Sequence, residues 1–275
     1  RYAQFLREAF DTRGISPTAL NNFLTCPWRW FYNNFFYTQF VPSIAQRSGT
    51  AAHAALEDFF NTRNTQEVGK EYLLDRFAHY LDDADMRPDE YERMHAEMST
   101  ALAGWYEAYN GTFPQHTKNE LAIRGVLLDD IRLTGKIDRI ECMERDASPE
   151  TCRDVRVLDY KTSKPKSDAE AAGERGSDKN ISGAGAYKRQ IVFYKLLLDR
   201  YADGKYRMHA GVIDYIQPNQ SGKYKQNVFT VTEQDEREVM QHIRETAEAI
   251  RTCSFWEERC SDKDCKWCAL RDTME

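Results

Sequence analysis

Two runs carry most of the information in this chain: Leu133-Thr-Gly-Lys-Ile-Asp-Arg-Ile140 and Val157-Leu-Asp-Tyr-Lys-Thr162. Apolar residues alternate with polar ones in and around both runs, which is typical of β-strands. The segment between them, Asp146-Ala-Ser-Pro-Glu150, has the composition of a turn. We therefore predict an antiparallel hairpin folded about Ser148 and Pro149.

Such a hairpin would bring three charged side chains together. Its pairing sets position 138 opposite position 159, so Asp138 and Asp159 are predicted to be cross-strand neighbours. Lys161 follows Asp159 by two residues and points to the same face. A solvated Asp-x-Lys at a strand end is the simpler interpretation of that tripeptide alone. Together with Gly135-x-x-Asp138, however, the group favours a divalent-metal site next to a phosphate, because buried charges need compensation.

The overall composition is that of a soluble globular protein. The chain has 275 residues, a formal net charge of -6 and ordinary apolar and charged fractions. This charge argues against a basic protein that coats nucleic acid. It is compatible with a local basic channel and with metal-ion chemistry on phosphates.

The sequence contains no recognisable targeting signal. It has no apolar stretch long enough to cross a bilayer and no signal peptide, so we expect a cytoplasmic protein without a membrane partner. Because the first residue is Arg1 rather than Met, we expect further sequence upstream. No Gly-x-x-x-x-Gly-Lys-Ser/Thr occurs, so an ATP-driven motor would have to lie in that upstream part.

The pattern along the chain predicts an α/β fold, with a lead-in helix or linker over residues 1–15 and one domain over residues 16–275. Helices are predicted at Thr18–Leu24, Gly49–Phe60, Gln66–Tyr80, Tyr91–Tyr109, Ala186–Tyr201 and Glu233–Arg251, and strands at Glu120–Leu128, Ile131–Cys142, Asp154–Asp159, His209–Ile216 and Val228–Val231. Residues 50–112 are predicted to form a helical insertion, and Pro165–Gly185 a mobile loop. This order predicts a mixed central sheet flanked by helices.

Two of the helices carry paired polar side chains. His53 and Glu57 are one turn apart, and Gly49 precedes them on the same stripe. His53 could simply be satisfied by Glu57, but beside a carboxylate site its imidazole can serve as a further metal ligand. Gln190 and Tyr194 are likewise one turn apart. The tyrosine could be a core-edge residue, or the pair could hydrogen-bond a DNA phosphate or orient the attacking water.

An aromatic cluster follows Cys26-Pro27. Its members are Trp28, Trp30, Phe31, Tyr32, Phe35, Phe36, Tyr37 and Phe40. Packing in a core or at an interface is the expected role, and stacking on nucleobases is the alternative.

Seven cysteines fit poorly with a framework of paired disulfides. The run Cys260-Ser-Asp-Lys-Asp-Cys265-Lys-Trp-Cys268, with Cys253 nearby, resembles a metal-ligand pattern over residues 253–268. Reduced, unbound thiols are the alternative. Cys142 and Cys152 flank the predicted turn and are expected to be incidental. The candidate ligands, which would join the two ends of the domain, are Cys26, Cys260, Cys265 and Cys268.

With these residues in view, the chain resembles the PD-(D/E)XK nuclease superfamily and, within it, the RecB-like exonuclease domains. The motifs that carry the resemblance are Ser16-x-x-x-Leu20-x-x-Phe23-x-x-Cys26-Pro27, Gly49-x-x-x-His53-x-x-x-Glu57, Gly135-x-x-Asp138, Asp159-Tyr160-Lys161-Thr162 and Gln190-x-x-x-Tyr194. The resemblance implies a restriction-endonuclease-like core, and often a fusion behind a recombination-type helicase. Some relatives carry a four-cysteine [4Fe-4S] cluster, but here the extra thiol precedes the Cys-x-x-Cys pair, so zinc or no metal remains open.

The resemblance also implies roles for individual residues. Asp138, Asp159, His53 and the carbonyl of Tyr160 would hold Mg²⁺ or Mn²⁺, and Lys161 would position and help deprotonate the water. The supporting motif would be Gln190 and Tyr194.

From these features we expect a metal-dependent DNA nuclease, an exonuclease or end-processing enzyme that works with a helicase in recombination or repair. The alternatives are a catalytically silent nucleic-acid-binding or scaffolding domain of the same fold, and a restriction-type or transposon-end endonuclease.

Overall fold

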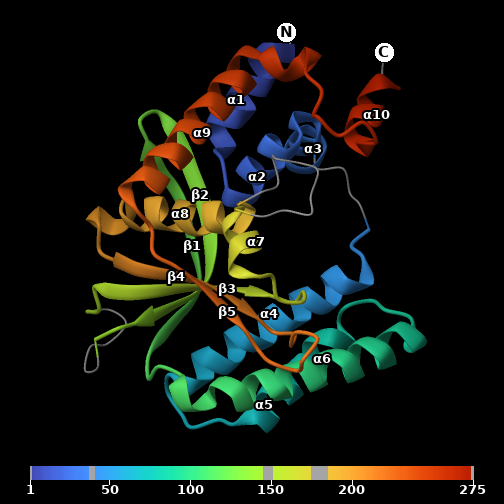
Figure 1. The fold of residues 1–275 in the computed structure, drawn as a ribbon, viewed down its shortest axis with the longest axis vertical. Helices are drawn as coiled ribbons and strands as arrows, with labels where there is room; N and C mark the ends of the chain where they lie inside the picture. Colours follow the sequence, from blue (N-terminus) through green and yellow to red (C-terminus); the bar gives the residue numbers. More distant parts are fainter. Residues whose placement is uncertain (1, 37–40, 145–150, 175–184, 274–275) are drawn as a thin grey trace.

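The computed structural model describes residues 2–36, 41–144, 151–174 and 185–273 (Figure 1). A five-stranded sheet forms its centre. The strands are β1 (Thr117–Leu128), β2 (Ile131–Cys142), β3 (Asp154–Lys161), β4 (Arg207–Tyr215) and β5 (Gln226–Phe229). They lie side by side in chain order, and all neighbours are antiparallel except β3 and β4, which are parallel. The predicted mixed sheet is therefore confirmed.

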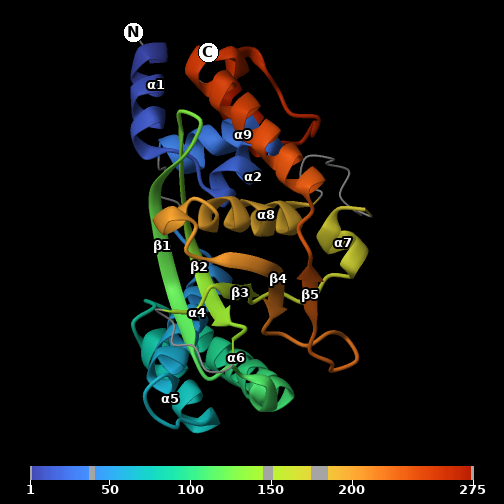
Figure 2. The same cartoon turned by 90° about the vertical axis from the view of Figure 1, so that its left-hand side faces the viewer.

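Helices cover both faces of this sheet (Figures 1 and 2). On one side lie α4 (Ile44–Arg63), α5 (Lys70–Asp82) and α6 (Pro88–Tyr109). On the other side lie α1 (Tyr2–Arg13), α2 (Pro17–Thr25), α3 (Pro27–Trp30), α8 (Ala186–Leu198), α9 (Glu233–Thr252) and α10 (Lys266–Asp272). The predicted α/β class with flanking helices is thus confirmed. Within the described ranges, every helix is too short or too polar to span a lipid bilayer.

Two hydrophobic cores hold the layers together. One lies between α4, α5 and α6 and reaches the sheet at Tyr160 and Ile216. The other lies between the sheet and the remaining helices, where α8 contributes residues such as Phe193 and Leu197. The strand ends that carry the predicted site therefore meet both cores.

The pairing of β2 with β3 has the predicted register. Arg139 pairs with Leu158, and one further step along the same register sets Asp138 opposite Asp159. The turn predicted at Asp146–Glu150 lies outside the described residues.

The pairing of β1 with β2 contains a bulge at Gly125, which has a φ of +73°. A bulge shifts the register by one residue. Leu121 consequently pairs with Ile137, and Glu120 lies opposite Asp138. Without the bulge, Leu121 would occupy that place.

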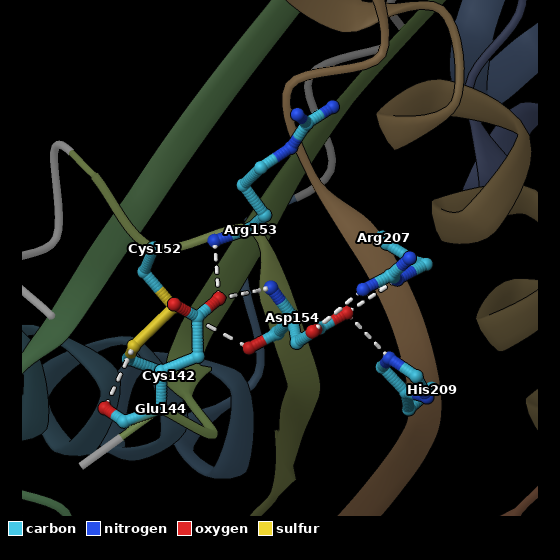
Figure 3. The surroundings of a disulfide bond; sticks show 7 residues. All are labelled: Cys142, Glu144, Cys152, Arg153, Asp154, Arg207 and His209. Atoms are coloured by element: carbon cyan, nitrogen blue, oxygen red, sulfur yellow. Dashed lines mark hydrogen bonds and ion pairs between the residues drawn. A yellow bond between two sulfur atoms is a disulfide. The ribbon is translucent and has the colours of Figure 1, made fainter.

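Cys142 and Cys152 form a disulfide between the end of β2 and the segment that leads into β3 (Figure 3). The expectation that they are incidental was wrong, because the strand pairing itself brings the two thiols together. Next to the disulfide, the carboxylate of Glu144 accepts hydrogen bonds from the backbone N–H groups of Arg153 and Asp154, at 2.9 and 3.0 Å. The disulfide and these bonds fix the hairpin at this end.

The stretch Pro165–Gly185, predicted to be a loop, contains the short helix α7 (Asp168–Ala172). Ser167 and Glu170 form a capping box at its start, in which each side chain accepts a hydrogen bond from the other's backbone N–H. A helix of five residues is too short to show periodicity in the sequence. Residues 175–184 lie outside the described part.

The N-terminal elements follow their sequence signals. The expected lead-in helix is α1, and an ion pair between Asp11 and Arg251 at 2.7 Å joins it to α9. Ser16 caps α2 by accepting a hydrogen bond from the N–H of Ala19, and Pro17 occupies the first helical position, as predicted.

The aromatic cluster packs mainly into the core, as expected. Its buried members are Trp28, Trp30, Phe31 and Tyr32. Trp28, Trp30 and Phe31 pack against Phe255, which follows α9, whereas Phe36 is exposed. Tyr37 and Phe40 lie outside the described residues.

Candidate active site

Asp138, Asp159 and Lys161 lie together, as the hairpin predicted. The Lys161 Nζ is 2.6 Å from Asp159 Oδ2. Asp138 Oδ2 accepts a hydrogen bond of 2.8 Å from the backbone N–H of Tyr160, on the neighbouring strand. Both carboxylates are largely buried, with side-chain exposures of 13% for Asp138 and 4% for Asp159.

Gln190 and Tyr194, on α8, complete a hydrogen-bond network around Asp159. Tyr194 donates its hydroxyl proton to Asp159 Oδ1 at 2.9 Å, and Gln190 Nε2 donates to the same oxygen at 2.7 Å. The carbonyl of the Gln190 amide accepts a hydrogen bond of 3.1 Å from Lys161. Asp159 and Lys161 are therefore held by two residues from a separate helix.

His53 approaches the same place from α4. Its Nδ1 lies 3.4 Å from Asp138 Oδ2, so its acidic partner is Asp138 rather than Glu57. Gly49 explains how α4 comes so close to the end of β3, because a Cβ at this position would lie 3.0 Å from Thr162 Oγ1. The predicted role of Gly49, a close approach of this helix, fits that contact.

Glu120, on β1, belongs to the site but was missed by the sequence analysis. Within the described residues, His53, Glu120 and Asp138 each offer a ligand atom, and these atoms all lie within 4.8 Å of one another. Glu120 has a positive φ of 52°, which is unusual for a residue other than glycine, and it forms an ion pair with Lys136. This acidic group with its histidine is a candidate site for a divalent metal ion.

The predicted ligand set differed from this group. Asp159 is not among the three residues, and its carboxylate contacts Lys161, Gln190 and Tyr194 instead. The Tyr160 backbone nevertheless reaches the group, since it hydrogen-bonds with His53.

Burial and like charge dominate the electrostatics. Burial, together with the charge of Asp159, raises the pKa of Asp138 to about 8. Burial also lowers the pKa of His53, which keeps its imidazole neutral and able to bind a metal. For Lys161, burial lowers the pKa, but the charge and hydrogen bond of Asp159 outweigh it, so the net pKa is raised. The lysine therefore stays protonated.

A cleft of about 860 Å³ opens beside these groups. Its polar wall includes His53, Glu120 and Asp138, and Lys136 adds a positive charge. His53 lies on α4, which also lines the cleft through Gly49. The cleft gives a ligand access to the candidate metal ligands.

A second ligand group lies between the ends of the chain. Its members are Cys26, Cys260, Cys265 and Cys268, whose sulfur atoms all lie within 4.8 Å of one another. The four predicted cysteines are therefore brought together, and such a group could hold zinc or an iron-sulfur centre. Cys253 is free and not part of this group.

Comparisons with known proteins identify a family for this chain. A model of the PD-(D/E)XK nuclease superfamily matches residues 14–273. Among solved structures, the chain is similar in fold to a crystal structure from Eubacterium rectale described as a "Putative exonuclease". The TM-score is 0.54 and the identity 11%, over 96% of this chain and 90% of that chain. No curated protein matches. Since the family match covers nearly the whole sequence, the chain belongs to the PD-(D/E)XK nuclease superfamily.

Proposed function

We propose that this protein is a divalent-metal-dependent nuclease that hydrolyses phosphodiester bonds in DNA. The observation that carries the proposal is the meeting of Asp138, Asp159 and Lys161 beside His53 and Glu120. A silent member of the superfamily would have no need to keep this set of ionisable groups buried, because burial of such groups is unfavourable without compensating partners.

The donor set suits a hard divalent ion. His53, Glu120 and Asp138 would hold it, with two carboxylates and one neutral imidazole. Carboxylate oxygens suit Mg²⁺ and Mn²⁺, and the imidazole adds a preference for the softer of the two, Mn²⁺. Asp159 and the Tyr160 carbonyl are the remaining candidates for coordination. The chemistry that such an ion supplies is activation of a water molecule and neutralisation of charge on the phosphate.

Lys161 supplies a fixed positive charge. Because its pKa is raised, it acts as a cation that faces the phosphate rather than as a base that removes a proton from water. Asp159 and the carbonyl of Gln190 hold its ammonium in place. Tyr194, whose pKa is raised well above the ordinary value by burial, remains protonated and keeps donating its hydrogen bond to Asp159. The charge is thus positioned before substrate binds, which favours transition-state stabilisation.

We further propose that the enzyme degrades or trims DNA from its ends and works with a helicase domain or subunit. The description of the Eubacterium rectale protein as a "Putative exonuclease" supports the exonuclease assignment. The helicase partner rests on the resemblance to RecB-like domains alone.

Cleavage of end-labelled linear DNA and of covalently closed circular DNA tests the proposal. We expect the linear substrate to be degraded with Mg²⁺ or Mn²⁺ and not with EDTA, and the circle to be spared. Cleavage of the closed circle would instead identify an endonuclease. Absence of cleavage of any DNA with either ion would favour the silent domain.

Two variants control for the site. Asp138→Asn should lose cleavage, because it removes a carboxylate from the candidate ligand group. Asp130→Asn is the matched control, since Asp130 is an exposed residue that pairs with Arg251 outside this site. Equal activity of both variants would overturn the assignment.

A further inference from the structure

The four-cysteine group has the dimensions of a site for one ion. The sulfur atom of Cys26 lies 3.7 Å from that of Cys268 and 3.8 Å from that of Cys265. Cys260 lies 3.7 Å from Cys268. A single tetrahedral ion with metal–sulfur bonds of about 2.3 Å requires sulfur atoms about 3.8 Å apart. These three separations match that tetrahedron.

The same separations disagree with a [4Fe-4S] cluster. In such a cluster each cysteine binds a different iron atom, and the inorganic core lies between the four thiolates. The sulfur atoms must then stand well apart, whereas here they touch. Cys26 cannot easily move outward, because its backbone joins α2 to α3: its N–H donates to Asn22 and its carbonyl accepts from Trp30.

The surroundings of the cysteines suit thiolates bound to an ion. Burial raises the pKa of the Cys26 thiol, while backbone hydrogen bonds from Arg29 to Cys26, and from Trp267 and Cys268 to Cys265, act in the opposite direction and favour the charged sulfur. Such contacts orient metal ligands. A hollow of about 290 Å³ borders the group and gives an ion a path to it from solvent.

An ion here would organise a segment that has little structure of its own. Residues 258–265 are irregular and lead into the short helix α10. The Trp28 indole ties this segment to α3 by donating to the carbonyl of Glu258 at 3.0 Å. Tyr32, in the π-helical turn Phe31–Phe35, stacks on Trp267 of α10. An ion bound by Cys26 and by the three C-terminal cysteines would cross-link this segment to the start of α3.

We propose that Cys26, Cys260, Cys265 and Cys268 hold one zinc ion in a tetrahedral site that joins the α2–α3 turn to the C-terminal segment. The site is structural, because all four positions are filled by cysteine and none is left for a substrate. The inference is independent of the proposed nuclease activity.

Metal analysis of the full chain, purified anaerobically, tests the proposal. We expect one zinc per chain, no acid-labile sulfide and a colourless protein. Substitution of cobalt for zinc should give the visible bands of a tetrahedral thiolate site. Iron with sulfide and a brown colour would overturn the proposal, as would iron alone or four free thiols without metal.

Two variants locate the ion. Cys260→Ser should lose the zinc or bind it far more weakly, and should unfold at a lower temperature. Cys253→Ser is the matched control, because Cys253 lies near this segment but outside the ligand group, and it should keep the full zinc content. Full retention of zinc by Cys260→Ser, or equal loss from both variants, would contradict the assignment. Neither readout depends on DNA cleavage.

Discussion

The carboxylate site and the four-cysteine group both collect metal-ligand side chains, but the fold assembles them in different ways. Asp138 and Glu120 are neighbours across one strand pairing, and the sheet determines their separation. Cys26 and Cys268 are 242 positions apart in sequence, and only the packing of the two chain ends brings them together.

This difference has a chemical counterpart. The carboxylate site lies beside a cleft and contains a cationic lysine next to hard oxygen ligands. In the four-cysteine group, Cys26 and Cys268 are buried, and cysteine sulfurs would fill all four positions around an ion and leave none for a substrate. An open site with hard ligands is suited to chemistry on a phosphate, and a closed site with soft ligands to holding a fold together.

The largest effect is expected for Lys161→Ala. Removal of a preorganised cation should lower the cleavage rate by about 100-fold or more, while the protein still folds and binds DNA. Cleavage of labelled linear DNA and a DNA-binding titration measure the two properties. Lys195→Ala, which changes a lysine of α8 that pairs with Asp199 instead, should leave cleavage unchanged. Normal cleavage by Lys161→Ala would mean that the lysine does not assist chemistry on a phosphate. The proposed distinction between a catalytic carboxylate site and a structural cysteine site would then lose its support.

The second-largest effect is expected for Glu120→Gln, and it concerns metal binding. Loss of a charged ligand should weaken Mn²⁺ binding by about tenfold or more, as measured by calorimetric titration of the metal-free protein. Glu57→Gln is a sharp control, because Glu57 lines the same cleft but is not in the ligand group. If both variants bind Mn²⁺ equally well, Glu120 is not a ligand.

The carboxylate site should also respond to pH. Folding raises the pKa of Asp138 from 3.8 to about 8 because of burial and the charge of Asp159. Between these values the metal-free folded state holds a proton that the unfolded state lacks, so its stability falls as pH rises through this window. A divalent ion must displace that proton, so its affinity should rise with pH up to about 8 and then level off.

Mn²⁺ titrations below and above pH 8 measure this dependence. In Asp138→Asn the titrating group is absent, and the residual binding should lose the slope. A wild-type affinity that does not change with pH would show that no proton is displaced from Asp138.

The smallest effect is expected for a contact between α2, which leads to the cysteine group, and α8, which carries Gln190 of the carboxylate site. Asn21, on α2, which ends just before Cys26, accepts a hydrogen bond of 2.7 Å from Arg189 and donates to the carbonyl of Ala186. Both partners lie in the first turn of α8, next to Gln190. Asn21→Ala should lower the free energy of unfolding by about 1 kcal/mol and reduce cleavage only a few-fold. Thermal unfolding and cleavage assays check this, and a loss of cleavage as large as that of Lys161→Ala would contradict it.

The hairpin was predictable because side chains alternate along a strand and a turn fixes the register. Asp138, Asp159 and Lys161 followed from these two rules. Glu120 did not, because the bulge at Gly125 shifts the register by one residue. A glycine inside an otherwise strand-like run was the available signal.

The cysteines show the corresponding limit for long-range contacts. Residue type and spacing suggested the four ligands, but only the packing of α3 against the C-terminal segment gives their separations. The Cys142–Cys152 disulfide could have been predicted, since the register of β2 and β3 brings these positions close together. The odd number of cysteines argues against a complete framework of disulfides, but it does not exclude a single bond.

The most direct test of the central claim is the rate of cleavage of labelled linear DNA as a function of Mn²⁺ concentration, for the wild type and Asp138→Asn side by side. We predict that the metal-free wild type is inactive and that its rate rises to saturation with added ion, whereas the variant stays inactive across the same range. Undiminished cleavage in EDTA, or a variant that follows the wild-type curve, would contradict a hydrolytic site built on these carboxylates.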